Sequence, residues 1–252
     1  MISIKSPREI EIMRRAGRIA ARARSIAKDM TAVGVTTGEI DREVRTYIEK
    51  SEAVPSFLRY GGFPAGSCIS INEEVIHGIP GDRRVNEGDI VSFDVGAFYK
   101  GYHGDCADSF IAGKGSVQAK MLIEITRMSF FEGIKFARSG CRISDISNAI
   151  QVFAERHGFS VVREFVGHGI GADLHEEPVI PNFGKPGHGP RLLPGMTLAI
   201  EPMVNAGAAG VLVAGDDWTV VTRDGSLSAH YENTVLVTDG EPEILTLREG
   251  SP

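Results

Sequence analysis

An internal repeat constrains the fold of this chain more than any other feature of its 252 residues. A helical pattern recurs 106 residues later, where Gly34, Ile40, Val44 and Tyr47 are matched by Gly140, Ile146, Ile150 and Phe153. The acidic residues recur in step with it, Asp94 as Glu201 and Asp105 as Glu232. The repeat predicts one domain over residues 1–252 with two halves, about 6–113 and 116–240, related by a pseudo-twofold axis. Each half would give one carboxylate hairpin to a shared centre.

The local patterns predict a mixed α/β fold. Capping boxes at Ser6 and Thr36 begin two helices, the first of which stops near Gly34. A hairpin follows, with a strand at residues 90–95, a turn at Lys100-Gly101 and a second run that ends at Asp105. In the second half we expect helices at 116–138 and 140–157 and a glycine-rich turn at 167–171. Further strands are expected at 67–71, 159–166, 196–204, 218–222 and 230–238, with Glu201 inside the strand at 196–204 and Glu232 inside the strand at 230–238.

The four repeated acids predict a metal centre. A carboxylate buried among apolar residues is costly unless it is paired or binds a cation, and two close carboxylates repel each other. Asp94, Asp105, Glu201 and Glu232 together carry a charge of about -4, which two divalent ions would match. His168, between two glycines, is the best candidate for an imidazole ligand. Such an oxygen-rich set suits Mn, Fe, Co or Zn without selecting among them.

Composition narrows the setting of the protein. The net charge of -6 and the absence of a basic block give no reason to expect nucleic-acid binding. No apolar run approaches the ~20 residues of a membrane helix, and no signal peptide precedes the first helix, so we expect a cytoplasmic protein. Three widely spaced cysteines favour neither a disulfide framework nor a zinc knuckle. Nothing indicates an obligate partner, so a monomer is expected.

Six motifs in this order resemble the type I methionine aminopeptidases over residues 3–247. They are HGIP from His77, the pair Asp94 and Asp105, GHGIG around His168, HEEP from His175, IEPMV around Glu201 and YENT around Glu232. The resemblance implies the pita-bread fold, two αβ halves around a dinuclear metal site. It also implies removal of the initiator methionine from nascent polypeptides when the second residue is small, with a possible transient contact at the ribosome.

The resemblance also implies a role for each matched residue. The metal ligands would be Asp94, Asp105, His168, Glu201 and Glu232, of which Asp105 and Glu232 would bridge both ions. His175 would donate to the charge of the tetrahedral intermediate, His77 would contact the amide nitrogen of the substrate, and Glu201 would carry a proton to the leaving amine.

The methionine pocket implied by the resemblance is lined by Tyr60, Phe63, Cys68 and Trp218. The residues alone leave Cys68 open between a pocket wall and ordinary core. Leu174 stands where the family usually has an aromatic residue, which implies a wider pocket rim. The remaining histidines have no matching role and are interpreted as surface or structural residues: His103, His157, His188 and His230.

Three other readings compete with this one. Prolidases and aminopeptidase P-like enzymes share the fold and metal set but usually carry a large N-terminal domain, for which the first helix at Ser6 leaves no room. Type II methionine aminopeptidases carry a helical insertion, for which the interval between His175 and Glu201 is too short. A non-catalytic binding protein of the same fold would not need all five ligand positions to be filled.

Overall fold

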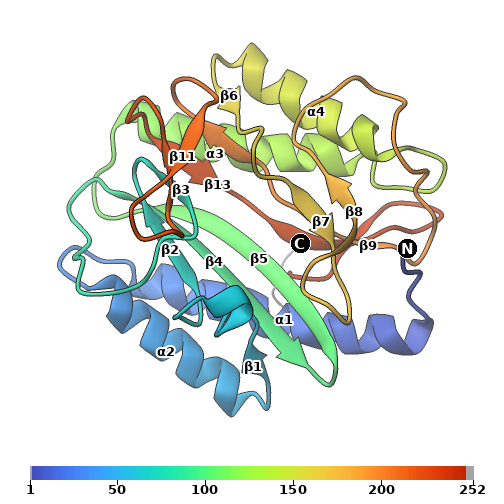
Figure 1. Ribbon diagram of the computed structural model, residues 1–252, viewed down its shortest axis with the longest axis horizontal. Coiled ribbons are helices and arrows are strands. Elements are labelled where there is room, and N and C mark those ends of the chain that lie inside the picture. Colours follow the sequence, from blue (N-terminus) through green and yellow to red (C-terminus); the bar gives the residue numbers. More distant parts are fainter. Residues whose placement is uncertain (1, 248–252) are drawn as a thin grey trace.

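Two pairs of helices enclose a central set of strands. The structure, a computed structural model, describes residues 2–247 (Figure 1). Helices α1 (Pro7–Met30) and α2 (Thr37–Lys50) lie along one side of a long hairpin, and α3 (Val117–Ile134) and α4 (Ile143–Arg156) lie on the other side of the molecule. Within residues 2–247, four small sheets occupy the space between the helix pairs.

Both helices of the first half begin at the predicted capping boxes. In each, the N-cap hydroxyl and the glutamate three residues later satisfy each other's backbone N–H groups: Ser6 with Glu9, and Thr36 with Glu39. Helix α1 presents a stripe of buried alanines to the hairpin. A Cβ atom at Gly104 would come within 2.6 Å of the Gly17 nitrogen, so only glycine lets α1 pass this close to the hairpin.

The hairpin consists of β4 (Ile90–Tyr99) and β5 (Tyr102–Ile111), which pair antiparallel along their whole length. Lys100 and Gly101, with φ of 47° and 93°, make the predicted two-residue turn, for which positive φ at both positions matches the twist of the strands. Strands β1 (Val54–Pro55) and β2 (Cys68–Ile71) pair with β4. A 3-10 turn, η1 (Tyr60–Gly62), lies between β1 and β2.

The second half has shorter strands in three sheets. A five-stranded sheet has the order β15 (Glu243–Ile244), β14 (Asn233–Leu236), β9 (Thr197–Ile200), β7 (Gly167–Gly169) and β8 (Glu176–Ile180). A second sheet joins β13 (Ser228–His230), β10 (Met203–Asn205) and β6 (Ser160–Val161). The third joins β11 (Val211–Val213), β12 (Val220–Thr222) and β3 (Glu74–Ile76), which brings a strand of the first half beside two of the second.

Several strand predictions for the second half are wrong. The strand expected at 196–204 is two strands in different sheets, β9 and β10, separated by Glu201 and Pro202, and proline has no N–H to continue a ladder. The strand expected at 230–238 is likewise divided into β13 and β14, with Glu232 in the gap rather than inside a strand. Of the strand expected at 159–166, only residues 160–161 form a strand, β6, which pairs with β10.

The glycine-rich turn expected at 167–171 is also wrong, because Gly167–Gly169 form strand β7, which lies between β9 and β8. A Cβ atom at Gly167 would lie 2.4 Å from the Ala199 oxygen, and one at Gly169 would lie 2.2 Å from the Glu177 oxygen. These glycines therefore serve close approach between backbones rather than a turn. Within residues 2–247, no helix is long and apolar enough to cross a membrane.

Candidate metal centre and substrate pocket

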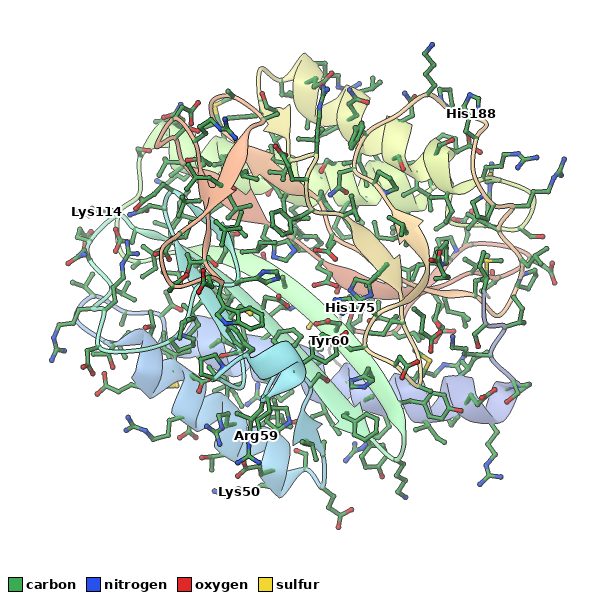
Figure 2. The ribbon with its side chains drawn as sticks, viewed as in Figure 1. Lys50, Arg59, Tyr60, Lys114, His175 and His188 are labelled. Carbon is green, nitrogen blue, oxygen red and sulfur yellow. The ribbon has the colours of Figure 1, made fainter. Side chains whose placement is uncertain are left out.

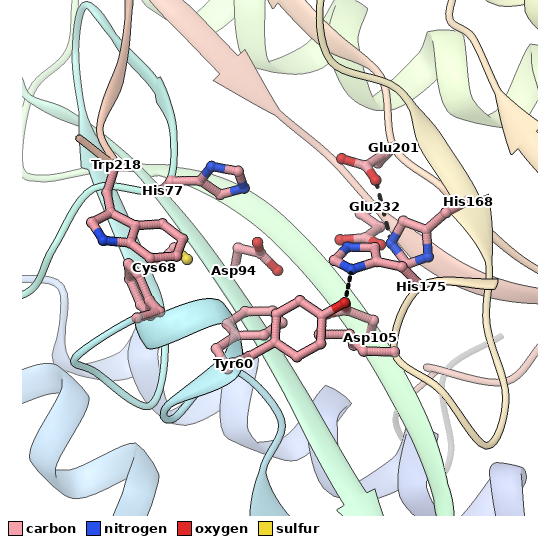
Figure 3. Close-up of a pocket in the computed structure, with 13 residues that line it drawn as sticks. Tyr60, Cys68, His77, Asp94, Asp105, His168, His175, Glu201, Trp218 and Glu232 are labelled. Carbon is pink, nitrogen blue, oxygen red and sulfur yellow. Dashed lines mark hydrogen bonds and ion pairs between the residues drawn. The ribbon is translucent and has the colours of Figure 1, made fainter. Parts of the chain in front are cut away.

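One cavity between the two halves is lined by every residue that the sequence proposed for the site (Figure 3). The five proposed ligands come from both halves: Asp94, Asp105, His168, Glu201 and Glu232. The proposed substrate contacts share the cavity with them: Tyr60, Phe63, Cys68, His77, His175 and Trp218. Phe57 and Leu174 complete the lining.

The register of the hairpin places the first two carboxylates together. Asp94 of β4 is opposite Ala107, and Asp105 of β5 is opposite Gly96, so the two aspartates are diagonal neighbours on one face of the hairpin. Cys68 of β2 is directly opposite Asp94 on the other side of β4. The Cys68 thiol is therefore part of the cavity wall beside the carboxylates. The sequence alone had left Cys68 open between a pocket wall and ordinary core.

The other two carboxylates lie where the second-half strands break. Strand β9 ends at Ile200, which pairs with Asn233 at the start of β14. Glu201 follows Ile200 and Glu232 precedes Asn233. If the antiparallel register continued by one residue, these two glutamates would lie opposite each other. Freed from the ladder, both side chains reach the same cavity.

His168 is held with one ring nitrogen free for a ligand. Its Nδ1 lies 2.8 Å from the Gly169 carbonyl oxygen, so Nδ1–H donates and the lone pair of the neutral ring is on Nε2. That Nε2 lies 3.6 Å from a carboxylate oxygen of Glu201 (Figure 3). Burial lowers the pKa of His168 to about 3, so the ring is neutral, as a metal ligand must be.

The four carboxylates gather around one cavity, where they raise one another's pKa values. Burial and mutual repulsion raise the pKa of Asp94 and Glu232 well above their usual values. Burial also raises the pKa of Asp105 and of Glu201 to about 8, with the repulsion of Glu201 added at Asp105. One carboxylate oxygen in each of Asp94, Asp105 and Glu232 is buried with no hydrogen-bond partner.

These residues fit a divalent cation. Ligand atoms of Asp105, His168 and Glu232 all lie within 4.8 Å of one another, a separation that a single ion with bonds of about 2.0–2.6 Å can span. A cation would satisfy the buried carboxylate oxygens and remove the repulsion that raises their pKa values. Asp94 and Glu201 lie at the same cavity and would extend the set.

The rest of the cavity is aromatic and carries two further imidazoles. The Tyr60 hydroxyl lies 2.6 Å from Nδ1 of His175, whose ring packs edge-on against His168 at 4.2 Å between centroids. Phe63 and Trp218 pack edge-to-face at 5.1 Å. Leu174 is buried in the wall beside them. His77 has a positive φ of 59°, which aims its side chain inward from the turn before Gly78.

The four histidines without a predicted role differ in their surroundings. His188 is exposed on a surface loop far from Tyr60 and His175 (Figure 2). His103 and His157 each make a hydrogen bond away from the cavity, His103 to Ser56 Oγ at 2.9 Å and His157 to the Phe153 carbonyl oxygen at 2.8 Å. His230 is buried, and its Nε2 lies 3.6 Å from Glu201 without a hydrogen-bond partner.

His230 is the neighbour of the site that sequence reasoning missed. Burial lowers its pKa to about 3, so it is a neutral ring beside Glu201. The signal in the sequence was its position two residues before Glu232, at the end of a strand. Its proximity to Glu201 follows from the pairing of β13 with β10, in which His230 is opposite Met203, and no local pattern reports that pairing.

Comparison with known proteins agrees with this geometry. The sequence profile of metallopeptidase family M24 matches residues 11–239. The chain therefore belongs to metallopeptidase family M24. Its relatives place it among the methionine aminopeptidases of that family. The methionine aminopeptidase of Clostridium acetobutylicum is 54% identical over 250 residues, covering 99% of this chain and 100% of the relative. Methionine aminopeptidase 1 of Bacillus subtilis is 50% identical over 246 residues, covering 98% and 99%.

Solved structures give the same result for the fold. The crystal structure of the Thermotoga maritima methionine aminopeptidase superposes with a TM-score of 0.97 at 46% identity, covering 99% of this chain and 100% of that one. The prolidase of Pyrococcus furiosus superposes with a TM-score of 0.80 at 24% identity, covering 98% of this chain and 66% of the prolidase. The architecture described above is the pita-bread fold that these proteins share, as predicted.

Proposed function

We propose that this protein is a metal-dependent aminopeptidase that removes the N-terminal methionine of nascent proteins. One observation carries the proposal: the imidazole of His168 and several carboxylates with buried oxygens that lack a hydrogen-bond partner share one cavity with aromatic side chains. The first part can hold divalent ions, and the second can hold a long apolar side chain. Full-length relatives that are methionine aminopeptidases support the same activity.

The ligands of two divalent ions would be Asp94, Asp105, His168, Glu201 and Glu232. Bound ions would lower the pKa of a water molecule to near neutrality and polarise the scissile carbonyl. Glu201 has one carboxylate oxygen near His168 and the other near His230. From this position the Glu201 carboxylate could accept a proton from the water and return it to the leaving amine.

The two histidines outside the ligand set would handle the peptide. Burial lowers the pKa of His77 to about 4 and that of His175 below its usual value, so both rings are neutral donors or acceptors. The hydrogen bond between Tyr60 and Nδ1 of His175 leaves Nε2 of His175 directed at the cavity (Figure 3). With Tyr60 donating, Nε2 carries the proton and can stabilise the oxyanion. His77 would contact the amide nitrogen beyond the scissile bond.

The pocket would select methionine, and the approach to the carboxylates would select a small second residue. Methionine is unbranched and pliable, which suits a pocket of Phe63, Trp218 and Leu174. Steric exclusion of a bulky second residue costs a few kcal/mol, about a hundredfold in rate.

Peptide hydrolysis tests the proposal directly. We expect the metal-loaded protein to release methionine from Met-Gly-Met, to act at least about a hundredfold more slowly on Met-Ile-Met, and to leave Gly-Pro intact. Preferential cleavage of Gly-Pro would indicate a prolidase instead, and equal rates on Met-Gly-Met and Met-Ile-Met would contradict the small-residue rule.

The setting of this activity is proposed on the same basis. The substrates would be the N-termini of nascent chains, reached in the cytoplasm by a monomer with at most a transient ribosome contact. Sedimentation at micromolar concentration with and without ribosomes would test the last two points together.

A further inference from the structure

Arg24 of α1 reaches across the boundary between the two halves of the molecule. Its Nη1 donates to the Ala107 carbonyl oxygen at 3.3 Å, the Glu232 carbonyl oxygen at 3.1 Å and Asn233 Oδ1 at 3.1 Å. Its Nη2 donates to the Thr246 carbonyl oxygen at 3.2 Å. One side chain from the first helix thus contacts β5, the residues around Glu232 and the C-terminal segment.

Two of those acceptors belong to a backbone bridge that joins the halves. The Ala107 N–H donates to the Glu232 carbonyl oxygen at 3.2 Å, and the Glu232 N–H donates to that of Ala107 at 3.0 Å. The Nη1 group of Arg24 therefore binds both carbonyl oxygens of this reciprocal pair. A charged donor that binds both carbonyl oxygens strengthens the link between β5 and the residue before β14.

The bridge also determines where two proposed ligands lie. Glu232 is in the bridge, and Asp105 is two residues from Ala107 on β5. Thr234 extends the same connection, because its hydroxyl accepts from the Asp105 N–H and donates to the Asp105 carbonyl oxygen, both at 2.9 Å. The separation of the Asp105 and Glu232 carboxylates is thus set by how firmly β5 is held to the chain before β14.

We propose that Arg24 is a positioning residue for the candidate metal centre: it holds the Ala107–Glu232 bridge, and thereby the spacing of Asp105 and Glu232. The inference rests on the proposed function, since it requires these carboxylates to bind divalent ions. Glu232 lies between two strands, whereas Asp105 is fixed by the ladder of β5. The contacts of Arg24 therefore act on the ligand whose own backbone is less constrained. Outer-shell partners of metal ligands typically contribute 10- to 100-fold in metal affinity.

The test compares two identical substitutions on one helix. Arg24→Lys keeps the positive charge but loses the planar fork that reaches several acceptors at once. Arg22→Lys makes the same change two residues earlier, at a position that takes no part in these hydrogen bonds. Affinity of the metal-stripped proteins for Mn²⁺ is measured by calorimetry, and their melting temperature is measured without metal.

We expect Arg24→Lys to weaken Mn²⁺ binding at least about tenfold while Arg22→Lys stays within twofold of the unmodified protein. Unchanged Mn²⁺ affinity in a folded Arg24→Lys protein would overturn the inference, whatever its melting temperature, because a purely structural residue would lower stability alone. If Arg24→Lys does not fold, Arg24→Gln is judged by the same criterion. Failure of the unmodified protein to bind Mn²⁺ would instead refute the proposed function.

Discussion

The two halves of the molecule present their carboxylates by different means. In the first half, Asp94 and Asp105 are inside a continuous antiparallel hairpin, and the ladder fixes their relative position residue by residue. In the second half, Glu201 and Glu232 occupy gaps between strands of different sheets. The acids that match in the sequence repeat therefore have different settings, a fixed ladder register for one pair and strand breaks for the other.

This difference indicates where the site is supported from outside. A carboxylate inside a ladder is positioned by its own strand, whereas one in a gap depends on neighbours. Glu232 has the backbone bridge to Ala107 and the guanidinium of Arg24, and Glu201 has the rings of His168 and His230 close to its two oxygens. Substitutions in each half can therefore separate the two contributions.

Asp105→Asn should abolish activity although it changes the shape of the hairpin little. Loss of the ionised ligand removes metal-based activation of water, which supplies several kcal/mol, so the rate of methionine release should fall at least about a thousandfold. Glu232→Gln should do the same from the other half. Steady-state kinetics with metal analysis checks this, and a Glu232→Gln protein that keeps both its metal and its rate would show that only the hairpin carboxylates matter.

His175→Ala should separate chemistry from metal binding. Its side chain is outside the proposed ligand set, so the metal content should remain. Loss of an oxyanion donor should raise the activation free energy by about 3 kcal/mol, which lowers kcat roughly a hundredfold. His188→Ala, on an exposed loop, is the matched control and should be unchanged. Metal lost together with activity in His175→Ala would contradict the assignment.

The metal-free protein should become less stable as pH rises from about 6.5 to 8. In the folded state the pKa of Asp105 and of Glu201 is raised to about 8. In the unfolded chain their pKa values are near 3.8 and 4.5, so both groups are already ionised in this pH range. The folded state thus binds more protons, and stability falls by about 1.4 kcal/mol per pH unit for each. The buried histidines His168 and His230 have a pKa of 6.5 in the unfolded chain and a lower one in the folded protein, so they change the stability only below about pH 6.5.

Thermal unfolding with and without Mn²⁺ measures this effect. Bound ions should remove the decline, because the ligands are then already ionised in the folded state. A melting temperature that rises with pH between 6.5 and 8 in the metal-free protein would mean that the carboxylates are not mutually destabilised.

Gly96→Ala should test the rigidity of the hairpin beside Asp105. A Cβ atom at position 96 would lie 2.6 Å from Ser56 Cβ, and such overpacking costs about 1–3 kcal/mol of unfolding free energy. Gly215→Ala has open space around it and should stay within about 0.5 kcal/mol. Urea unfolding compares the two, and equal stability would show that the hairpin yields more easily than its register suggests.

Tyr60→Phe should have the smallest effect. It removes one hydrogen bond, to Nδ1 of His175, which is worth about 1 kcal/mol, or roughly fivefold in kcat. The pocket wall keeps its aromatic ring, so KM for Met-Gly-Met should hold. A change in KM alone would mean that Tyr60 contacts the substrate without orienting His175.

Local pattern in the sequence predicted the elements whose structure is local. The capping boxes at Ser6 and Thr36 and the turn at Lys100-Gly101 are where they were expected, because each is decided by a few neighbouring residues. The repeat and the family motifs indicated eleven site residues, and all eleven line one cavity. Their individual roles stay predictions.

The features that sequence reasoning missed depend on contacts between distant segments. An apolar run through residues 196–204 looks like one strand, and only the change of sheet at Pro202 reveals two. The glycines at 167 and 169 suggest a turn until the backbones of Ala199 and Glu177 are seen beside them. His230 and Arg24 lie close to the site through partners far away in sequence.

The central claim is that carboxylates from both halves jointly hold the ions that remove an N-terminal methionine. It is tested most directly by titrating the metal-stripped protein with Mn²⁺ while measuring methionine release from Met-Gly-Met. The account predicts almost no release without metal and activity that saturates at no more than two ions per chain. Full activity in the metal-stripped protein, or Mn²⁺ binding that restores no methionine release, would contradict it.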